Sequence, residues 1–447
     1  MPSTATRRMW LRGAAGLALV ENGWSADWPL FRGEGYGGVA TGKLPVEWNC
    51  DPAAGPDKNI QWKTAVPGLG HASPIILGDR IYLITAESED AGKRSLKLGL
   101  YGDIKPADDN GVQTWLLLCL DRKTGREIYR KPFRKQKPGS VRHTMATHAN
   151  STLASDGKYL VACLGADGLY CFDKSGKVLW QVELGPMRLG MYGADWGYSS
   201  AAAIAKDRVF IVCDEVKEPF FASYDLRTGK PGFRVSRKGV SERSWSTPFV
   251  LTQAGKSQVI LNGYPWIVSY DAFTGEELWR LASGGDIPVP TPFVAGDLIY
   301  ITNGHGGKTP VYAIRQTAKG NITGTEHVAW SAEQGGAYLS TPVVYGGNIY
   351  LVNFNGVIRC FDAVTGKKHF EQRLGGNSLA VAASLVAGDD KVYVPTQDGD
   401  MIVLAAGNTF QQLAKNAMGA GLMATPAIAD GVLYVRTASQ MVAVRSS

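Results

Sequence analysis

A repeated unit occupies the chain of 447 residues from about residue 60 onward, and it limits the possible folds more than any other feature. Each unit opens with a small residue and proline before a short apolar run, and a Gly/Asp turn leads into a second run with an aromatic residue. A third run ends in Asp-x-x-Thr-Gly, and a fourth carries another aromatic residue. The opening pairs are Ser73-Pro74, Thr247-Pro248, Thr291-Pro292, Thr341-Pro342 and Thr425-Pro426, with weaker copies at Ser151-Thr152, Ser200-Ala201 and Ala383-Ser384.

The chemistry of each unit predicts four short strands. Runs such as residues 297–301 are rich in β-branched and aromatic residues and lack a helical period. The Asp-x-x-Thr-Gly element, which begins at Asp121, Asp225, Asp271 and Asp362, supplies a tight turn whose glycine accepts a positive φ. Four strands in a unit of about 42–50 residues are typical of a propeller blade. The eight units therefore predict an all-β fold, an eight-bladed β-propeller of four-stranded antiparallel blades.

The two ends of the repeat region complement each other. The eighth unit stops after its third strand, and an unmatched outer-strand segment, residues 59–63, precedes the first unit. We expect this N-terminal strand to complete the last blade, because closing the ring removes two exposed strand edges. The predicted organisation is an export signal over residues 1–26, an N-terminal arm over residues 27–59 and the propeller over residues 60–447.

The N-terminus carries the pattern of an export signal. The pair Arg7-Arg8 is followed by Met9, Trp10, Leu11 and Arg12, and a short apolar stretch covers residues 13–20. This arrangement resembles a twin-arginine signal and predicts a periplasmic or otherwise exported protein. After it, no apolar run approaches the ~20 residues that a membrane span needs, so no transmembrane segment is predicted.

Charge and cysteine content exclude several classes of protein. Lys and Arg number 47 and Asp and Glu 40, so the net charge of +7 is far from the dense positive stripe of a nucleic-acid binder. The six cysteines include no adjacent pair and no haem-attachment motif. Cys119, Cys171 and Cys360 each lie two residues before a turn aspartate, where Ser223 and Ser269 stand in other units. We therefore expect buried, structural thiols.

The turn element and the leader resemble a known family. Residues 271–279 read Asp-Ala-Phe-Thr-Gly-Glu-Glu-Leu-Trp, which is similar to the hallmark of the pyrroloquinoline quinone (PQQ)-like propeller family, and the resemblance covers nearly all of residues 60–447. Residues 27–33, Asp-Trp-Pro-Leu-Phe-Arg-Gly, resemble the start of exported bacterial members. The resemblance implies that Trp180, Trp279 and Trp330 pack between blades. It does not settle function, because the fold hosts quinoprotein dehydrogenases and also the propeller lipoprotein of the outer-membrane β-barrel assembly machinery, which binds no quinone.

Propeller topology predicts one face on which chemistry could occur. Loops before the inner strands and loops between the second and third strands share this face and surround the mouth of the central channel. Two basic loops there, residues 131–142 and 234–243, favour an anionic ligand, and an insertion over residues 87–114 falls on the same face. The candidate ligand-binding residues at the mouth are His71, His143, His148, Asp195, Trp196, Arg243, Trp245, Asp286 and His305.

Three functions are compatible with these residues. The favoured one is an exported scaffold that binds a small anionic ligand or a protein partner at the channel mouth. The second is a PQQ-dependent dehydrogenase with Ca²⁺, although the vicinal cysteine pair that quinoprotein alcohol dehydrogenases place against the cofactor is absent. The third is a metal-dependent enzyme that uses the histidines and aspartates of the mouth. No His-x-His or His-x-x-x-His spacing occurs, so no metal ligands are predicted, and the sequence leaves open whether the chain is catalytic.

Overall fold

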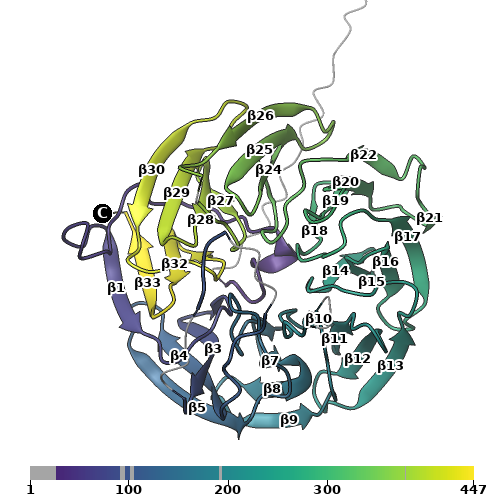
Figure 1. The fold of residues 1–447 in the computed structure, drawn as a ribbon, viewed down its shortest axis with the longest axis horizontal. Coiled ribbons are helices and arrows are strands. Elements are labelled where there is room, and N and C mark those ends of the chain that lie inside the picture. The colour runs from purple at the N-terminus through teal and green to yellow at the C-terminus, as the bar shows by residue number, and fades with distance from the viewer. Residues whose placement is uncertain (1–26, 91–95, 101–104, 191–193, 378, 447) are drawn as a thin grey trace, which may run out of the picture.

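The computed structural model describes residues 27–90, 96–100, 105–190, 194–377 and 379–446. Eight antiparallel sheets are arranged as blades around a central channel, as Figure 1 shows in a view down the channel. The predicted eight-bladed, all-β propeller is confirmed. The predicted export signal, residues 1–26, lies outside the described residues.

Blades 1 to 4 each run from an inner strand at the channel to an outer strand at the rim. Blade 1 consists of β2 (Ile75–Leu77), β3 (Arg80–Ser88), β4 (Gln113–Asp121) and β5 (Glu127–Gln136). Blade 2 consists of β6 (Ala154–Ser155), β7 (Tyr159–Cys163), β8 (Leu169–Asp173) and β9 (Val178–Val182), with the single-turn helix η3 (Gly165–Asp167) between β7 and β8. Blade 3 consists of β10 (Ala203–Ala205), β11 (Arg208–Cys213), β12 (Phe220–Asp225) and β13 (Pro231–Ser236). Blade 4 consists of β14 (Phe249–Gln253), β15 (Lys256–Leu261), β16 (Trp266–Asp271) and β17 (Glu277–Ala282).

Blades 5 to 8 follow the same plan, with two departures. Blade 5 consists of β18 (Phe293–Ala295), β19 (Leu298–Thr302), β20 (Val311–Arg315) and β22 (Val328–Ala332), and its short β21 (Gly320–Asn321) instead joins β17 as a parallel fifth strand of blade 4. Blade 6 consists of β23 (Val343–Tyr345), β24 (Asn348–Val352), β25 (Val357–Asp362) and β26 (Lys368–Arg373). Blade 7 consists of β27 (Val386–Gly388), β28 (Lys391–Pro395), β29 (Asp400–Ala405) and β30 (Gln412–Ala417). Blade 8 consists of β31 (Ala427–Ala429), β32 (Val432–Arg436), β33 (Gln440–Arg445) and, from the start of the chain, β1 (Ile60–Ala65).

Aromatic side chains of the outer strands connect neighbouring blades. The Trp180 indole N–H donates to the Leu226 carbonyl of the next blade at 2.9 Å, and the ring covers Gly229, where a Cβ would lie 2.7 Å from the ring. Trp330 and Gly366 repeat this arrangement. The turn glycine is therefore required both for its positive φ and for the close approach of the ring. The expected packing of Trp180 and Trp330 between blades is confirmed.

Trp279 takes a different partner. Its ring is fully buried, but its indole N–H donates at 3.0 Å to the side chain of Gln258 within its own blade. Blade 5 offers no Asp-x-x-Thr-Gly turn after β20, because the chain there reads Arg-Gln-Thr-Ala-Lys-Gly over residues 315–320. The departure in sequence thus coincides with a different hydrogen-bond partner, while Trp279 still shares a buried cluster with Ile299 and Ile322 of blade 5, as expected for packing between blades.

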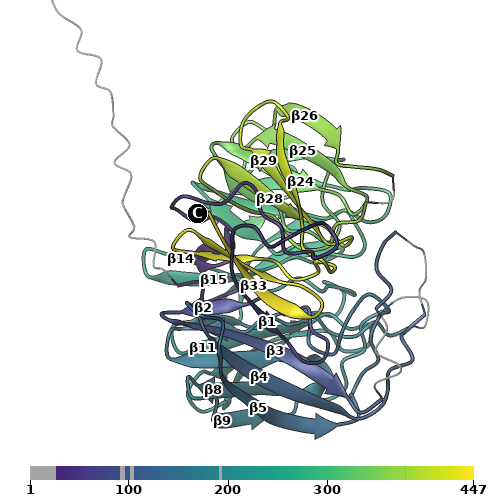
Figure 2. The same ribbon diagram turned by 90° about the vertical axis from the view of Figure 1, so that its left-hand side faces the viewer.

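The ring is closed by the N-terminal strand. β1 pairs antiparallel with β33, with Trp62 opposite Ala443 and Ala65 opposite Gln440, and the two strands lie side by side in Figure 2. The Trp62 indole N–H donates to the Arg122 carbonyl of blade 1 at 3.1 Å, and the ring covers Gly125. The last blade therefore meets the first through the same aromatic contact that joins other blades, and the predicted closure is confirmed.

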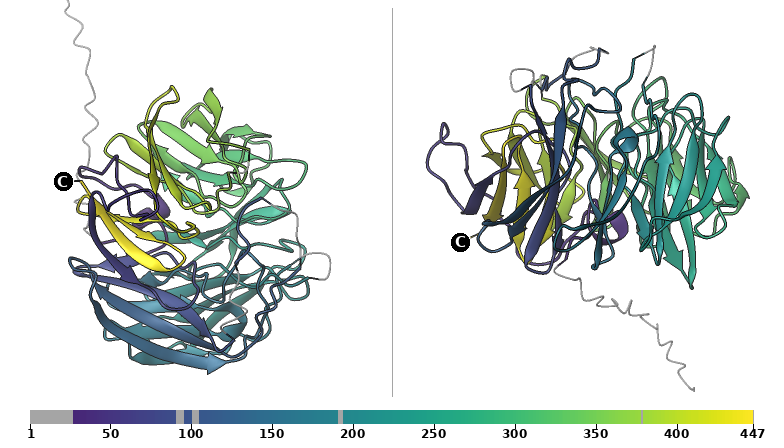
Figure 3. Two further views of the ribbon diagram at one scale, coloured as in Figure 1. Left: turned by 60° about the vertical axis from the view of Figure 1, so that its left-hand side comes forward. Right: turned by 90° about the horizontal axis from the view of Figure 1, so that it is seen from below.

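The N-terminal arm lies across the face opposite the insertion of blade 1. Figure 3 shows η1 (Glu34–Tyr36) on one side of the ring, and on the other side the described residues of the blade 1 insertion, 89–90, 96–100 and 105–112. Backbone bridges join Trp28 to Ile76 and Val39 to Ala387, so the arm contacts blades 1 and 7. None of the helical segments in the described ranges has the length and apolar character of a membrane span.

We predict that ring closure depends on β1. A chain that starts at Val66 should aggregate or unfold, because the edge of β33 is exposed and the contact of Trp62 with Gly125 is lost. A chain that starts at Asp27 keeps the arm and β1 and serves as the control. Size-exclusion chromatography and thermal unfolding measure the difference, and a monomeric short chain with the melting temperature of the control would contradict the prediction.

Candidate functional site

A ring of hydroxyl groups surrounds the channel where the inner strands begin. In six places the backbone N–H of one blade donates to the hydroxyl of the next blade at 2.9–3.0 Å, and the last of these, from Thr425 to Ser73, closes the ring. These residues come from the small-residue–proline pairs of the repeat and their weaker copies. We call them the hydroxyl belt, which consists of Ser73, Thr152, Thr247, Thr291, Thr341, Ser384 and Thr425.

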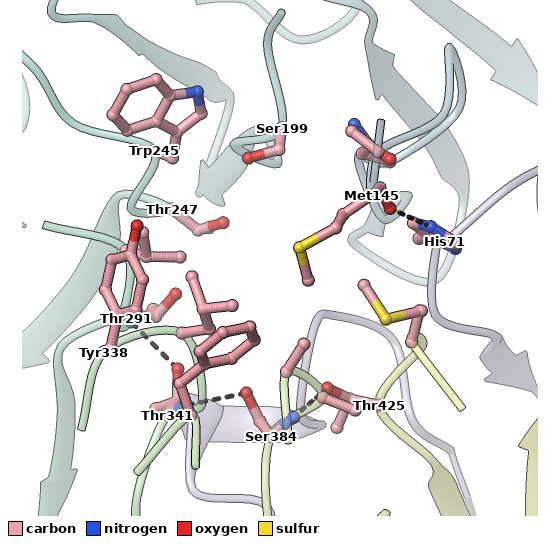
Figure 4. Close-up of a pocket in the computed structure, with 18 of the residues that line it drawn as sticks. His71, Met145, Ser199, Trp245, Thr247, Thr291, Tyr338, Thr341, Ser384 and Thr425 are labelled. Atoms are coloured by element: carbon pink, nitrogen blue, oxygen red, sulfur yellow. Dashed lines mark hydrogen bonds between the residues drawn. The ribbon is translucent and has the colours of Figure 1, made fainter. Parts of the chain in front are cut away.

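The hydroxyl belt lines a cavity of about 740 Å³ in the channel, and Figure 4 shows five of its members. Phe31 of the N-terminal arm also lines this cavity, and the neighbouring Arg32 donates at 2.6 Å to the carbonyl of Thr341 in the belt. The arm thus forms the floor, and the cavity faces the side of the blade 1 insertion. A volume of this size is in the usual range for a small-molecule site.

Aromatic side chains form part of the wall. The rings of Trp196 and Trp245 lie 5.8 Å apart at 30°, and the Trp245 indole N–H donates to the Gly197 carbonyl at 2.8 Å. Tyr338 contacts His305 at 5.0 Å and Phe354 at 6.1 Å between ring centroids. Because the Trp245 N–H is already bonded, this indole offers the cavity an apolar surface rather than a donor.

His71 lines the cavity as a neutral side chain. Its Nε2 bonds to the Met145 carbonyl at 2.8 Å, a contact visible in Figure 4. Burial lowers the pKa of His71 from its usual 6.5 to about 4, and the positive charges of Arg436 and Arg142 contribute to the lowering. The imidazole is therefore uncharged near neutral pH.

His305 is paired with a carboxylate at the cavity wall. Its Nδ1 lies 2.6 Å from Oδ1 of Asp286, and both side chains are partly exposed. His305 lines the cavity, whereas Asp286 stands behind it. The carboxylate fixes the orientation of the imidazole ring, as second-sphere carboxylates commonly do.

Five of the nine predicted mouth residues line the cavity together. They come from different loops, as propeller topology predicted, and they are His71, His143, Trp196, Trp245 and His305.

The other four predicted residues lie near the mouth without lining the cavity. His148 bonds through Nε2 to the Asp109 carbonyl at 3.1 Å, and burial lowers its pKa. Asp195 accepts the Gly197 N–H at 3.0 Å, and burial raises its pKa. Arg243 lies 3.9 Å from the carboxylate of Glu242, and Asp286 contacts His305. These four side chains contact loop residues, while Trp196, Trp245 and Ile287, one or two positions after Asp195, Arg243 and Asp286, line the cavity.

The basic loops do not supply charge to the cavity. The guanidinium of Arg237 pairs with Asp214 at 2.6 Å, and that of Arg142 pairs with Asp109 at 2.9 Å, all four side chains being buried. Arg134 pairs with Glu183 at 2.7 Å. In the described part of the chain, the residues that line the cavity include no Lys, Arg, Asp or Glu.

The blade 1 insertion reaches across the mouth side of the ring. The Gly99 N–H donates to Oε1 of Gln397 in blade 7 at 2.8 Å, and the Lys97 N–H donates to the Thr144 carbonyl at 3.0 Å. The side chain of Leu98 packs against Gly421, where a Cβ would lie 2.5 Å from its terminal carbon. Residues 96–100 therefore connect blade 1 to the opposite end of the repeat.

Sequence reasoning missed several residues that shape the cavity. Phe31 and the hydroxyl belt line the cavity near the N-terminal arm, and Met145 and Phe354 add apolar surface. The signals were present in the Phe31-Arg32-Gly33 leader and in the small-residue–proline pairs, which mark the inner strand of each blade. Their convergence on the channel depends on the ring and not on local sequence.

The side chains present do not fit PQQ with Ca²⁺. Calcium needs several carboxylate or carbonyl oxygens, and among the lining residues that the structure describes there is no carboxylate. No group of three or more His, Cys, Asp or Glu side chains within the described ranges could hold a metal ion. All six cysteines are unpaired and buried, and burial raises the pKa of Cys163 to about 11.

Comparison with known protein families gives one extended match. A family model described as "Outer membrane protein assembly factor BamB" matches residues 53–230, 222–323 and 321–447. A search of curated proteins finds no match.

Solved structures share the propeller at low sequence identity. BamB from Moraxella catarrhalis is 15% identical with a TM-score of 0.53, and the match covers 81% of this chain and 99% of that one. Quinohemoprotein alcohol dehydrogenase from Comamonas testosteroni is 13% identical with a TM-score of 0.59 and coverages of 94% and 81%. A europium-containing methanol dehydrogenase is 12% identical with a TM-score of 0.58 and coverages of 94% and 89%. At these identities the likeness shows the fold alone.

We predict that His71 makes the protein less stable in acid. The unfolded chain binds a proton at this residue near pH 6.5, but the folded chain binds it only near pH 4, so stability falls as pH drops from 6.5 to 4. In His71→Gln the loss of melting temperature across this interval should be smaller than in the wild type, while the two profiles run parallel above pH 7. Parallel profiles down to pH 4 would show that His71 is not held neutral.

Proposed function

The chain belongs to the PQQ-like propeller family described as outer membrane protein assembly factor BamB, and on this basis we propose that it is an exported scaffold that binds a small ligand in its central channel. The observation that carries the proposal is the cavity of about 740 Å³, which the N-terminal arm closes at one end. A pocket with one open end, aromatic walls and few polar groups is the usual form of a ligand site.

The lining supports binding more than catalysis. His71 is neutral, and its Nε2 bonds to a backbone carbonyl. General acid–base catalysis needs a group placed to exchange a proton with a substrate near the working pH, and the low pKa of His71 does not provide one. The aromatic surfaces of Trp196 and Trp245 suit a flat, apolar part of a ligand.

The family description favours a second candidate, in which the propeller binds a protein partner. Three outer strands carry apolar side chains that are about 40% exposed, namely Ile128 of β5, Leu179 of β9 and Leu278 of β17. These residues lie at the rim, away from the cavity lining, so a protein partner there would not compete with a ligand in the channel.

We predict that Phe354→Ala weakens ligand binding in the channel. A screen of small aromatic compounds by thermal shift should find ligands that raise the melting temperature, since filling one site at 100 times its Kd adds about 2.7 kcal/mol. Phe354 is partly exposed in the cavity wall, so its truncation should cost little folding stability and reduce affinity about tenfold. Phe273→Ala, in a turn that does not line the cavity, is the matched control. If no compound raises the melting temperature of the wild type, the protein-partner function is favoured over ligand binding.

Export forms part of the same proposal and is supported by the pattern of residues 6–20 and by the leader after them. The variant Arg7→Lys plus Arg8→Lys should remain in the cytoplasm of the native host, because a twin-arginine signal depends on the arginine pair. Arg12→Lys changes a neighbouring arginine and should still be exported. Cell fractionation measures the distribution, and equal periplasmic recovery of both variants would exclude the twin-arginine route.

A further inference from the structure

The hydroxyl belt has hydrogen-bond donors that the protein does not use. A serine or threonine hydroxyl has one donor hydrogen and two acceptor lone pairs. Six members of the belt accept a backbone N–H from the preceding blade, which occupies one lone pair and leaves the hydrogen uncommitted. The seventh, Thr291, has no partner at its Oγ1 among the described residues. Seven donor hydrogens are therefore available around one channel.

These donors are buried and surround a common space. The seven belt residues are only 1% to 6% exposed, and all of them line the cavity. Figure 4 shows Thr247, Thr291, Thr341, Ser384 and Thr425 following one another around the cavity. A buried donor group without an acceptor raises the free energy of the folded protein. A ligand with several acceptor oxygens can form the missing hydrogen bonds and lower that free energy.

Two buried arginines add positive charge beside the belt. Arg32 donates to the carbonyls of Thr341, Tyr36 and Gly37, and Arg436 donates to the carbonyls of Ala72 and Ile84. Neither guanidinium has a carboxylate partner in the described part of the chain.

Both arginines remain charged. Burial lowers the pKa of Arg32 and of Arg436 to about 9, which still leaves them protonated near neutral pH. A buried charge without a counter-ion carries a high desolvation cost, and an anion nearby reduces it. Arg142 and Arg237, by contrast, are paired with aspartates and contribute little net charge.

We propose that the hydroxyl belt binds the oxyanion end of the channel ligand, a carboxylate or phosphate carried on an aromatic or apolar body; this rests on the proposed function, that the cavity holds a small ligand. An oxyanion offers only acceptors and matches a ring of donors, as anions stabilised by several hydrogen bonds do elsewhere in proteins. Arg32 and Arg436 lie behind the belt and favour negative charge, and no carboxylate in the described lining opposes it. The apolar body then lies against Trp196, Trp245 and Phe354.

The experiment uses three matched probes on the full chain: phenylacetate, phenyl phosphate and the neutral 2-phenylethanol. Affinities are measured by NMR titration, which reaches millimolar Kd values. Thr291→Val removes one belt hydroxyl without breaking an interblade bond to its Oγ1, and Thr291→Ser restores the hydroxyl in nearly the same place. Phe354→Ala reports separately on the cavity wall.

The proposal expects at least one anionic probe to bind the wild type ten times more tightly than 2-phenylethanol. Thr291→Val should weaken that probe about ten- to hundredfold, as loss of a hydrogen bond to a charged group does, with little effect on the alcohol, and Thr291→Ser should bind like the wild type. Preference between the two acids identifies the oxyanion.

Three results would overturn the proposal. The alcohol could bind as tightly as both acids, with all affinities reduced by Phe354→Ala, in which case the cavity is a ligand site but its floor is not an oxyanion site. Thr291→Val could weaken the acids and the alcohol equally, which leads to the same conclusion. Failure of all three probes to bind would overturn the oxyanion site, and only a compound screen that is also negative would overturn the proposed function.

Discussion

The antiparallel pairing of β1 with β33 is the contact on which the rest of the molecule depends. Each blade covers its apolar faces with its two neighbours, so an open ring would leave faces of two blades in water. Closure also sets the geometry of the channel, because the hydroxyl belt is completed only when Thr425 of blade 8 reaches Ser73 of blade 1. The cavity is thus a product of the closed ring and not of any single blade.

The fold could be predicted from the sequence because the strand and turn patterns that specify it are local and repeated. The aspartate of each Asp-x-x-Thr-Gly turn accepts hydrogen bonds from residues two and three positions later, as at Asp121 and Asp362, so the turn is specified within five residues. The contacts by which the N-terminal arm closes one end of the channel could not be predicted. Arg32 donates to the carbonyl of Thr341, which lies 309 positions later in the chain, and the sequence around Arg32 does not predict this partner. Long-range contacts of this kind require the assembled ring.

The residues that line the cavity could be predicted at the level of loops but not of individual side chains. Asp195 and Trp196 are neighbours in sequence, yet only Trp196 lines the cavity, because adjacent residues in an extended segment point in different directions. Charge was misread for a related reason. Arg237 and Arg142 are paired with the buried Asp214 and Asp109, which lie 23 and 33 residues earlier in the chain, so a count of basic residues in the loops overstates the positive charge at the mouth.

The position of the N-terminal arm has a consequence for the order in which the molecule can be made. Val39 bridges to Ala387, and the Trp48 backbone N–H donates to Asn416, so the arm depends on blade 7. Translation produces the arm before any blade, and its partners emerge hundreds of residues later. Part of the earliest described segment to leave the ribosome therefore waits for most of the chain before it reaches its partners in blade 7. The proposed ligand cavity forms only after blade 8 has been made, because Thr425 completes the hydroxyl belt with Ser73.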